Sequence, residues 1–182
     1  MTSQTPRIDL PDAPILMAGA REAIWLTTDG EILRESLTDA RARVRGQEPP
    51  ILVHAPATTR RIGGRPFPCF DLLELFAFAK PAQFCTPTPA GLAEALGLPL
   101  PRNQEDAVGT IRRCAIALLQ DVGLQAGDPD ARRIAWAMAR GGWPWGPFVL
   151  AALGQDPDDM SARAPTAGLD VWRRLPEWEE EA

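Results

Sequence analysis

Short apolar runs separated by turn residues dominate the first third of the chain. Two such runs, Pro14–Ala18 and Arg21–Thr27, have the length of buried strands, and a third begins at Glu31. The intervening Thr28-Asp29-Gly30 predicts a β-hairpin, because Asp-Gly between apolar runs favours a tight turn. Residues 1–13 are polar and proline-marked, which predicts a loose lead-in.

The pattern then changes to helical spacing and back. Leu37, Ala40 and Val44 recur within 36–45 and predict a short helix, which the glycine and prolines of 46–50 end. A compact strand is expected over Ile51–His54. Ala55–Gly64, which contains two arginines followed by two glycines, indicates a turn or the start of a short helix.

The most apolar stretch, Cys69–Ala79, is hydrophobic nearly all round and is therefore expected to be buried on most sides. The residues expected to be largely buried in it are Phe70, Leu73, Leu75, Phe76 and Phe78. Helices follow over 90–98 and 105–121, where apolar residues recur at helical spacing. We expect a loop over 122–128.

From residue 129 the composition shifts towards tryptophan, glycine and proline. A helix over 129–140, a rigid aromatic turn over 141–147 and a short helix over 148–153 are predicted. These residues are too few to form their own core, so they should pack on the helix of 105–121, through Ile116 or Leu119. From Gln155 the chain is polar, as in a linker or docking tail.

Strands, helix, strand and helices in this order predict an α/β fold with one sheet that has helices on its faces. The net charge of −5 excludes an overall basic field for nucleic acid. Three cysteines without a Cys-x-x-Cys pair indicate neither a disulfide framework nor a zinc site, and reduced thiols suit a cytoplasmic protein. We expect no membrane span, since no apolar run is long enough.

The central stretch resembles the DnaQ-like 3′–5′ exonucleases, which have a ribonuclease-H-like fold. Ile51-Leu52-Val53-His54 matches the strand and histidine of the family's His-Asn-x-x-Phe-Asp pattern, but Ala55, Thr58 and Thr59 stand at its Asn, Phe and Asp positions. Asp71-Leu72-Leu73 is similar to the family's Asp-Thr-Leu element, at which a strand passes into a helix.

Two later motifs extend this resemblance over about residues 14 to 120. Residues 89–97 are similar to the family's small helix Ser-Leu-x-x-Leu-x-x-x-Leu-Gly. Residues 105–111 align with its His-x-Ala-x-x-Asp-Ala motif, with Glu105 at the histidine and Thr110 at the aspartate. The resemblance implies an RNase H-like mixed sheet flanked by helices, followed by a C-terminal helical appendage.

A second resemblance includes the end of the chain. The sequence FDLLELFAFAKP, then TPAGLAEALGLP, GWPWGP and GLDVWRRLPEWEE, is similar to the region that precedes the ATPase motor in bacterial DinG-like, Rad3-related DNA helicases. Lys80 is the only lysine and lies in no phosphate-binding Gly-x-x-x-x-Gly-Lys-Ser/Thr loop. The resemblance implies a degenerate exonuclease-like domain over 14–120, a docked helical appendage over 121–154 and a linker or tail over 155–182.

The family's chemistry requires about four carboxylates that hold two metal ions. The first strand has Ala18 and Gly19 where the family has acids, and Asp71 is the one acid in register. The resemblance therefore implies a catalytically silent accessory domain without a cofactor, whose partners are a helicase motor in the same polypeptide and single-stranded DNA. Two alternatives remain: an active nuclease that holds Mg²⁺ or Mn²⁺ through rearranged carboxylates, and a protein-binding adaptor.

Each candidate residue also has a structural interpretation. Asp29-Gly30-Glu31 fits a hairpin turn, Asp71 a helix N-cap, and His54 a structural histidine after a strand. Glu105 and Asp106 suit a helix start, where acids are favourable. The nucleic-acid contact candidates are Arg60, Arg61 and Arg65, and Trp143 and Trp145 can either stack on bases or fill the core of the appendage.

Overall fold

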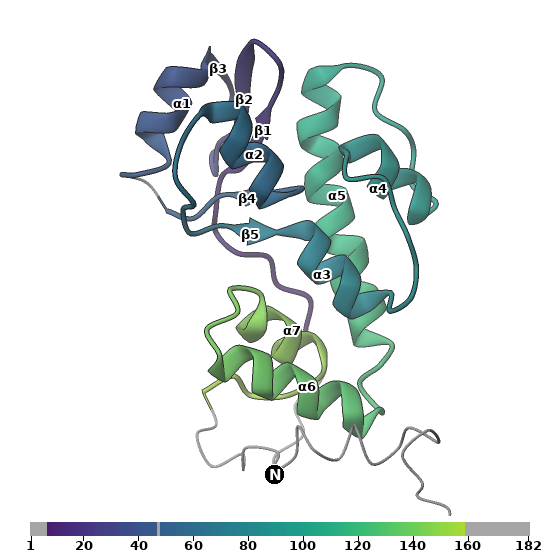
Figure 1. Ribbon diagram of the computed structural model, residues 1–182. Coiled ribbons are helices and arrows are strands. Elements are labelled where there is room, and N and C mark those ends of the chain that lie inside the picture. Colours follow the sequence, from purple (N-terminus) through teal and green to yellow (C-terminus); the bar gives the residue numbers. More distant parts are fainter. Residues whose placement is uncertain (1–6, 47, 159–182) are drawn as a thin grey trace, which may run out of the picture.

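The computed structural model describes residues 7–46 and 48–158, which form an α/β fold (Figure 1). Its five-stranded mixed sheet has the order β3-β2-β1-β4-β5. The strands are β1 (Ile15–Ala18), β2 (Glu22–Leu26), β3 (Ile32–Ser36), β4 (Ile51–Leu52) and β5 (Phe70–Asp71). The first three pair antiparallel, whereas β4 and β5 run parallel to β1.

Helices cover both faces of this sheet (Figure 1). They are α1 (Leu37–Arg43), α2 (Ala55–Ile62), α3 (Leu72–Ala79), α4 (Pro89–Ala95), α5 (Gln104–Gly123), α6 (Pro129–Arg140) and α7 (Gly146–Ala152). Each overlaps a segment predicted to be helical, except that Cys69–Ala79 divides into β5 and α3. Ala55–Ile62 is a full helix where a turn or helix start was indicated, α5 runs to Gly123 into the predicted loop, and α7 begins at Gly146 inside the predicted aromatic turn.

Alternation along the strands creates two separate apolar clusters. Ile15 and Ile24 point into the larger cluster, which contains residues of α3, α4, α5, α6 and α7. Leu16 and Trp25 point to the other face, where they pack with residues of α1 and α2. Successive side chains of a strand point to opposite faces, so both clusters follow from period-two patterning.

The predicted hairpin is confirmed. Gly30 has φ of 87°, a backbone conformation that glycine adopts at little cost, and it lies between β2 and β3. The backbone N–H of Thr27 donates to the carbonyl of Glu31 at 2.9 Å, which closes the turn.

Polar side chains immediately before the helices explain where most of them begin. In each case the side chain accepts a backbone N–H from the first turn, which satisfies a group without an intrahelical partner. These N-cap residues are Ser36, Asp71, Thr88, Asn103 and Asp128.

The burial expected for the most apolar stretch is only partly right. Leu75 and Phe76 are buried as predicted, whereas Phe70, Leu73 and Phe78 are only partly buried. Leu72, which the sequence analysis did not select, is fully buried. The strand ends at residue 71 and the helix begins at residue 72. The buried positions therefore do not follow the spacing expected for a single helix or a single strand over the whole stretch.

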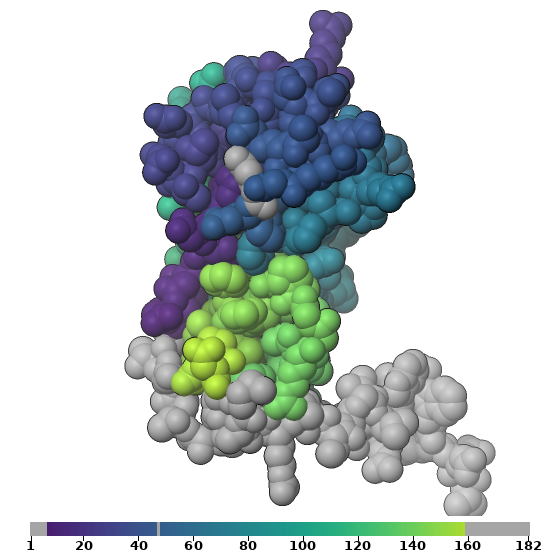
Figure 2. All heavy atoms as spheres, turned by 90° about the vertical axis from the view of Figure 1, so that its left-hand side faces the viewer, coloured from purple at the N-terminus to yellow at the C-terminus, as the bar shows by residue number. Residues whose placement is uncertain are grey.

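The helical appendage packs on the α/β region, and Figure 2 shows the two in continuous contact. Helix α7 lies against the end of α5, where Leu119 is fully buried in the shared cluster. The receiving surface also includes β5, through Phe70, whose ring centroid lies 5.2 Å from that of Trp145. Ile134 of α6 does not take part in this contact and is 46% exposed.

No helix of the described residues is long and apolar enough to cross a lipid bilayer. The tail was predicted over residues 155–182, and of these, residues 159–182 lie outside the described residues.

Candidate functional site

A small hollow lies at the carboxyl ends of the central strands. Its volume is about 50 Å³. Residues of β1, α2, α5 and the loop before α4 surround it, including Met17, Ala18, His54, Thr58, Arg61 and Ile111. Side chains that follow neighbouring parallel strands meet at such an edge, so a binding site formed by this sheet is most readily built here.

Arg61 sets the charge of this hollow. From the last turn of α2, its Nη1 donates a hydrogen bond of 2.9 Å to the carbonyl oxygen of Ala18, the final residue of β1. A guanidinium is a permanent cation. It therefore stands at the end of the strand where the exonuclease resemblance places metal-binding acids, and it opposes the binding of a second cation.

His54 lies between β4 and α2 and lines the same hollow. Its carbonyl oxygen accepts the backbone N–H of Thr58 at 3.0 Å, so its backbone begins the helix. The half-buried imidazole forms no hydrogen bond with any other described residue.

Asp71 lies beside this hollow but is fully engaged. Its Oδ1 accepts the backbone N–H of Leu73 at 2.8 Å, which confirms the predicted N-cap. Its Oδ2 accepts the backbone N–H of Ala55 at 2.7 Å, and the residue is 5% exposed. The carboxylate thus joins the start of α3 to the start of α2, and both oxygens are occupied without a metal.

The acids at the start of α5 have different partners. Glu105 pairs with Arg34 of β3 at 3.2 Å. Asp106 accepts the backbone N–H of Arg102 and a side-chain N–H of Arg113, each at 3.0 Å, and these bonds lower its pKa in that order of importance. Both acids therefore serve the helix start and the nearby arginines.

Thr110 occupies the family's last aspartate position and is completely buried. Its Oγ1 donates to the carbonyl of Asp106 at 2.8 Å and accepts a bond of 2.7 Å from Arg113. The hydroxyl fills its hydrogen-bonding capacity locally and carries no charge for a metal.

Asp29 and Glu31 are at the opposite end of the sheet. Because β2 runs antiparallel to β1, with Leu26 opposite Ile15, the hairpin after β2 lies beside the beginning of β1. The carboxyl ends of β1, β4 and β5 point the other way. Across residues 7–46 and 48–158, no group of three or more His, Cys, Asp or Glu side chains is placed to hold a metal ion.

The predicted arginines belong to a larger basic corner that the sequence analysis identified only in part. Arg60 and Arg61 lie on α2 and Arg65 follows it, all exposed. Arg65 lines a groove of about 500 Å³ together with Arg41 and Arg45 of the α1 region. The signal was present in the sequence, since 41–65 contains six arginines and one acid, Glu48.

The two tryptophans of the aromatic turn are structural. Trp145 is fully buried and its Nε1 donates to the carbonyl of Asp71 at 2.8 Å, so it cannot stack on a base. Trp143 donates from its Nε1 to Glu74 at 3.0 Å and packs on Phe78.

The cysteines are poor nucleophiles. Burial raises the pKa of Cys69 to about 12 and that of Cys114 to about 11, and it also raises the pKa of Cys85. All three are therefore thiols at neutral pH, whereas nucleophilic attack requires the thiolate.

Comparison with protein-family models, with curated proteins and with solved structures finds no significant match to this chain.

Proposed function

We propose that this chain is a catalytically silent, exonuclease-like accessory domain. The particular setting that we propose is the head of an ATP-dependent DNA helicase of the DinG-like type, in which the domain contacts nucleic acid or the rest of the polypeptide. A mixed five-stranded sheet with helices on both faces agrees with an RNase H-like arrangement. The helicase part rests on the sequence resemblance that extends through 141–147 and 168–180.

The observation that carries the proposal is the Arg61 contact with the end of β1. Two-metal hydrolysis needs several anionic oxygens converging on one point. Here a cation contacts the end of β1, and Asp71, the one acid in register with the exonuclease pattern, accepts a backbone N–H at each oxygen. The nuclease alternative would have to recruit that acid while its oxygens also accept the backbone N–H groups at the starts of α2 and α3.

A nuclease assay tests the silent part. We expect the full chain with Mn²⁺ to leave 5′-labelled single-stranded DNA as intact as in a buffer control, while an active 3′–5′ exonuclease shortens it in parallel. Processive shortening that is lost in Asp71→Asn would contradict the proposal and favour the nuclease with rearranged carboxylates.

The coding sequence downstream of residue 182 tests the helicase part. An ATPase motor with a Gly-x-x-x-x-Gly-Lys-Ser/Thr loop would support it. A stop codon directly after residue 182 would contradict it and leave the adaptor alternative.

A further inference from the structure

The strongest unassigned feature is the groove between α1 and the segment that follows α2. Its lining combines three arginines with an apolar surface, from Arg41, Val44, Arg45, Arg65, Pro66 and Phe67. The groove is separate from the hollow at the strand ends, since the two share no lining residue.

The local charge differs sharply from that of the whole chain. Residues 41–65 carry a surplus of five positive charges, counting the six arginines against Glu48, although the chain has a net charge of −5. The segments that contain these arginines, coloured blue, cover much of the upper half of the surface seen in Figure 2. A local basic surface on an acidic protein indicates an anionic ligand bound at one place.

The guanidinium groups of the groove are available to a ligand. Within residues 7–46 and 48–158, Arg41, Arg45 and Arg65 have no carboxylate partner within 4.0 Å, and all three are exposed. By contrast, Arg43 of the same helix is held by Glu35. Arg43 therefore stabilises the fold through an ion pair, whereas Arg41 and Arg45 face the solvent.

The groove is held in shape by the fold. Val44 and Phe67 belong to the apolar cluster beneath α1 and α2, so the floor is fixed. Gly63, with φ of 69°, ends α2. A Cβ at Gly64 would lie 3.8 Å from Cγ of Arg41, so the segment after α2 runs close to the Arg41 stem. The two walls therefore approach each other closely enough for one ligand to touch both.

We infer that this groove binds single-stranded nucleic acid along its phosphate backbone. Guanidinium groups bind phosphate oxygens through paired hydrogen bonds. The apolar surfaces of Pro66 and Phe67 suit unstacked bases, which a duplex keeps inside. The inference deepens the proposed function by naming the site and the ligand, and it rests on that function only for the choice of DNA as the probe.

Fluorescence anisotropy with a 5′-labelled oligothymidylate and the full chain tests the inference at several salt concentrations. We expect binding that weakens with salt and that falls at least about tenfold in the double variant Arg41→Glu/Arg65→Glu, with the salt slope reduced by about 1 to 1.5. The variant Arg41→Lys/Arg65→Lys should bind more tightly than the glutamate variant and less tightly than wild type, because the charges remain but the paired hydrogen bonds of the guanidinium groups are lost.

Arg112→Glu is the control outside the groove, and it reverses one charge where the double variant reverses two. Arg112 is exposed on α5, which packs on the other face of the sheet, and the substitution changes the net charge in the same direction. It should leave the affinity within about twofold. An equal loss in this control, or equal competition by polyglutamate, would show a general charge effect or an acidic-protein site and overturn the inference.

Failure of this inference is distinguishable from failure of the proposed function. If the folded wild-type chain does not bind oligothymidylate at low salt, the inference that the groove binds nucleic acid is wrong, and the proposal of a catalytically silent domain is unaffected. If the chain binds at the groove and also degrades DNA in the presence of Mn²⁺, the proposal of a catalytically silent domain is wrong, and the inferred binding site is retained. Circular dichroism of each variant shows that a loss of binding is not a loss of fold.

Discussion

The two faces of the sheet are built in different ways. The face that carries α3, α5 and the appendage buries 25 residues in one cluster, whereas the face that carries α1 and α2 buries seven. The smaller cluster is supplemented by a polar network and surrounded by arginines. Since burial of apolar surface is the main stabilising contribution, the first face dominates stability and the second is free to carry charge for binding.

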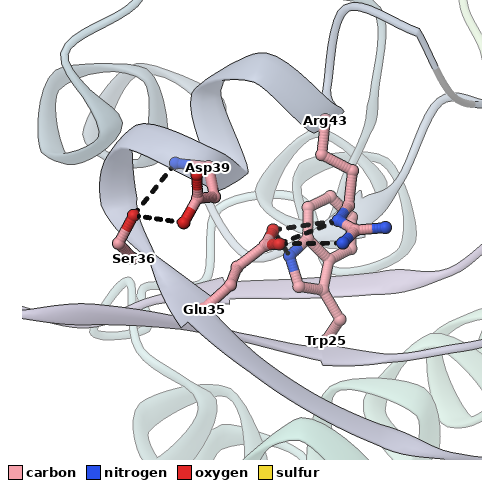
Figure 3. A network of polar contacts seen from close by, with 5 residues as sticks. All are labelled: Trp25, Glu35, Ser36, Asp39 and Arg43. Carbon is pink, nitrogen blue, oxygen red and sulfur yellow. Dashed lines mark hydrogen bonds and ion pairs between the residues drawn. The ribbon is translucent and has the colours of Figure 1, made fainter.

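The polar network of the smaller face shows how it compensates for its thin core (Figure 3). Glu35 accepts a 2.6 Å hydrogen bond from Nε1 of Trp25 and three bonds of 2.9–3.0 Å from Arg43. The Glu35 side chain is only 10% exposed, and its bond to Arg43 is the main cause of the raised pKa of that arginine. One carboxylate therefore fixes α1 to the sheet.

The largest expected effect comes from breaking the larger face. Leu75 is fully buried there, and Leu75→Ala should lower the free energy of unfolding by ~2–5 kcal/mol through the cavity it leaves. Leu33→Ala on the other face, where the side chain is only partly buried, should cost about 1 kcal/mol. Urea unfolding measures both, and equal losses would show that the two faces contribute alike.

An intermediate effect is expected from the network. Glu35→Gln keeps the shape but cannot accept all of the present donors and removes the ion pair with Arg43, so it should cost ~1–3 kcal/mol. Glu31→Gln, in the exposed hairpin, is the control and should be close to neutral. If thermal unfolding shows no difference between them, α1 is held by its apolar contacts alone.

The smallest effect is a pH dependence at the start of α5. Because hydrogen bonds lower the pKa of Asp106 in the folded state, its contribution is present above the unfolded pKa of about 3.9 and is lost as the pH falls through the lower folded value. Asp106→Asn should therefore lower Tm at pH 6, with the difference from wild type shrinking towards pH 2.5. A difference that is constant over this range would assign the effect to geometry instead of charge.

Much of the fold was predictable because local signals agree with it. Asp29-Gly30 fixed the hairpin in the prediction, and the glycine and prolines of 46–50 marked the end of α1. The apolar pattern of 69–79 alone did not show where a strand becomes a helix, because the pairing of β5 with β4 is a long-range contact. The resemblance placed that change from strand to helix at Asp71-Leu72-Leu73, where β5 ends and α3 begins.

The sequence predicted individual residues of the candidate site but not which of them contact one another. That Asp71 caps a helix followed from its place before an apolar run, and the structure confirms it. The contact of Arg61 with Ala18 joins residues 43 positions apart and depends on how α2 lies over β1, which no local pattern specifies. Arg41 and Arg45 were missed for a similar reason: they join Arg65 only through the packing of α1 beside the turn after α2.

The bond between Nε1 of Trp145 and the carbonyl of Asp71 has a consequence for where this protein can be divided. A cut near residue 120, at the expected edge of the α/β domain, would remove the tryptophan that covers Phe70 and satisfies that carbonyl. It would also bare the α5 surface on which α7 rests, and bared apolar surface of this kind promotes aggregation. We therefore expect the smallest fragment that folds stably to extend to about residue 154, because the appendage covers part of the core.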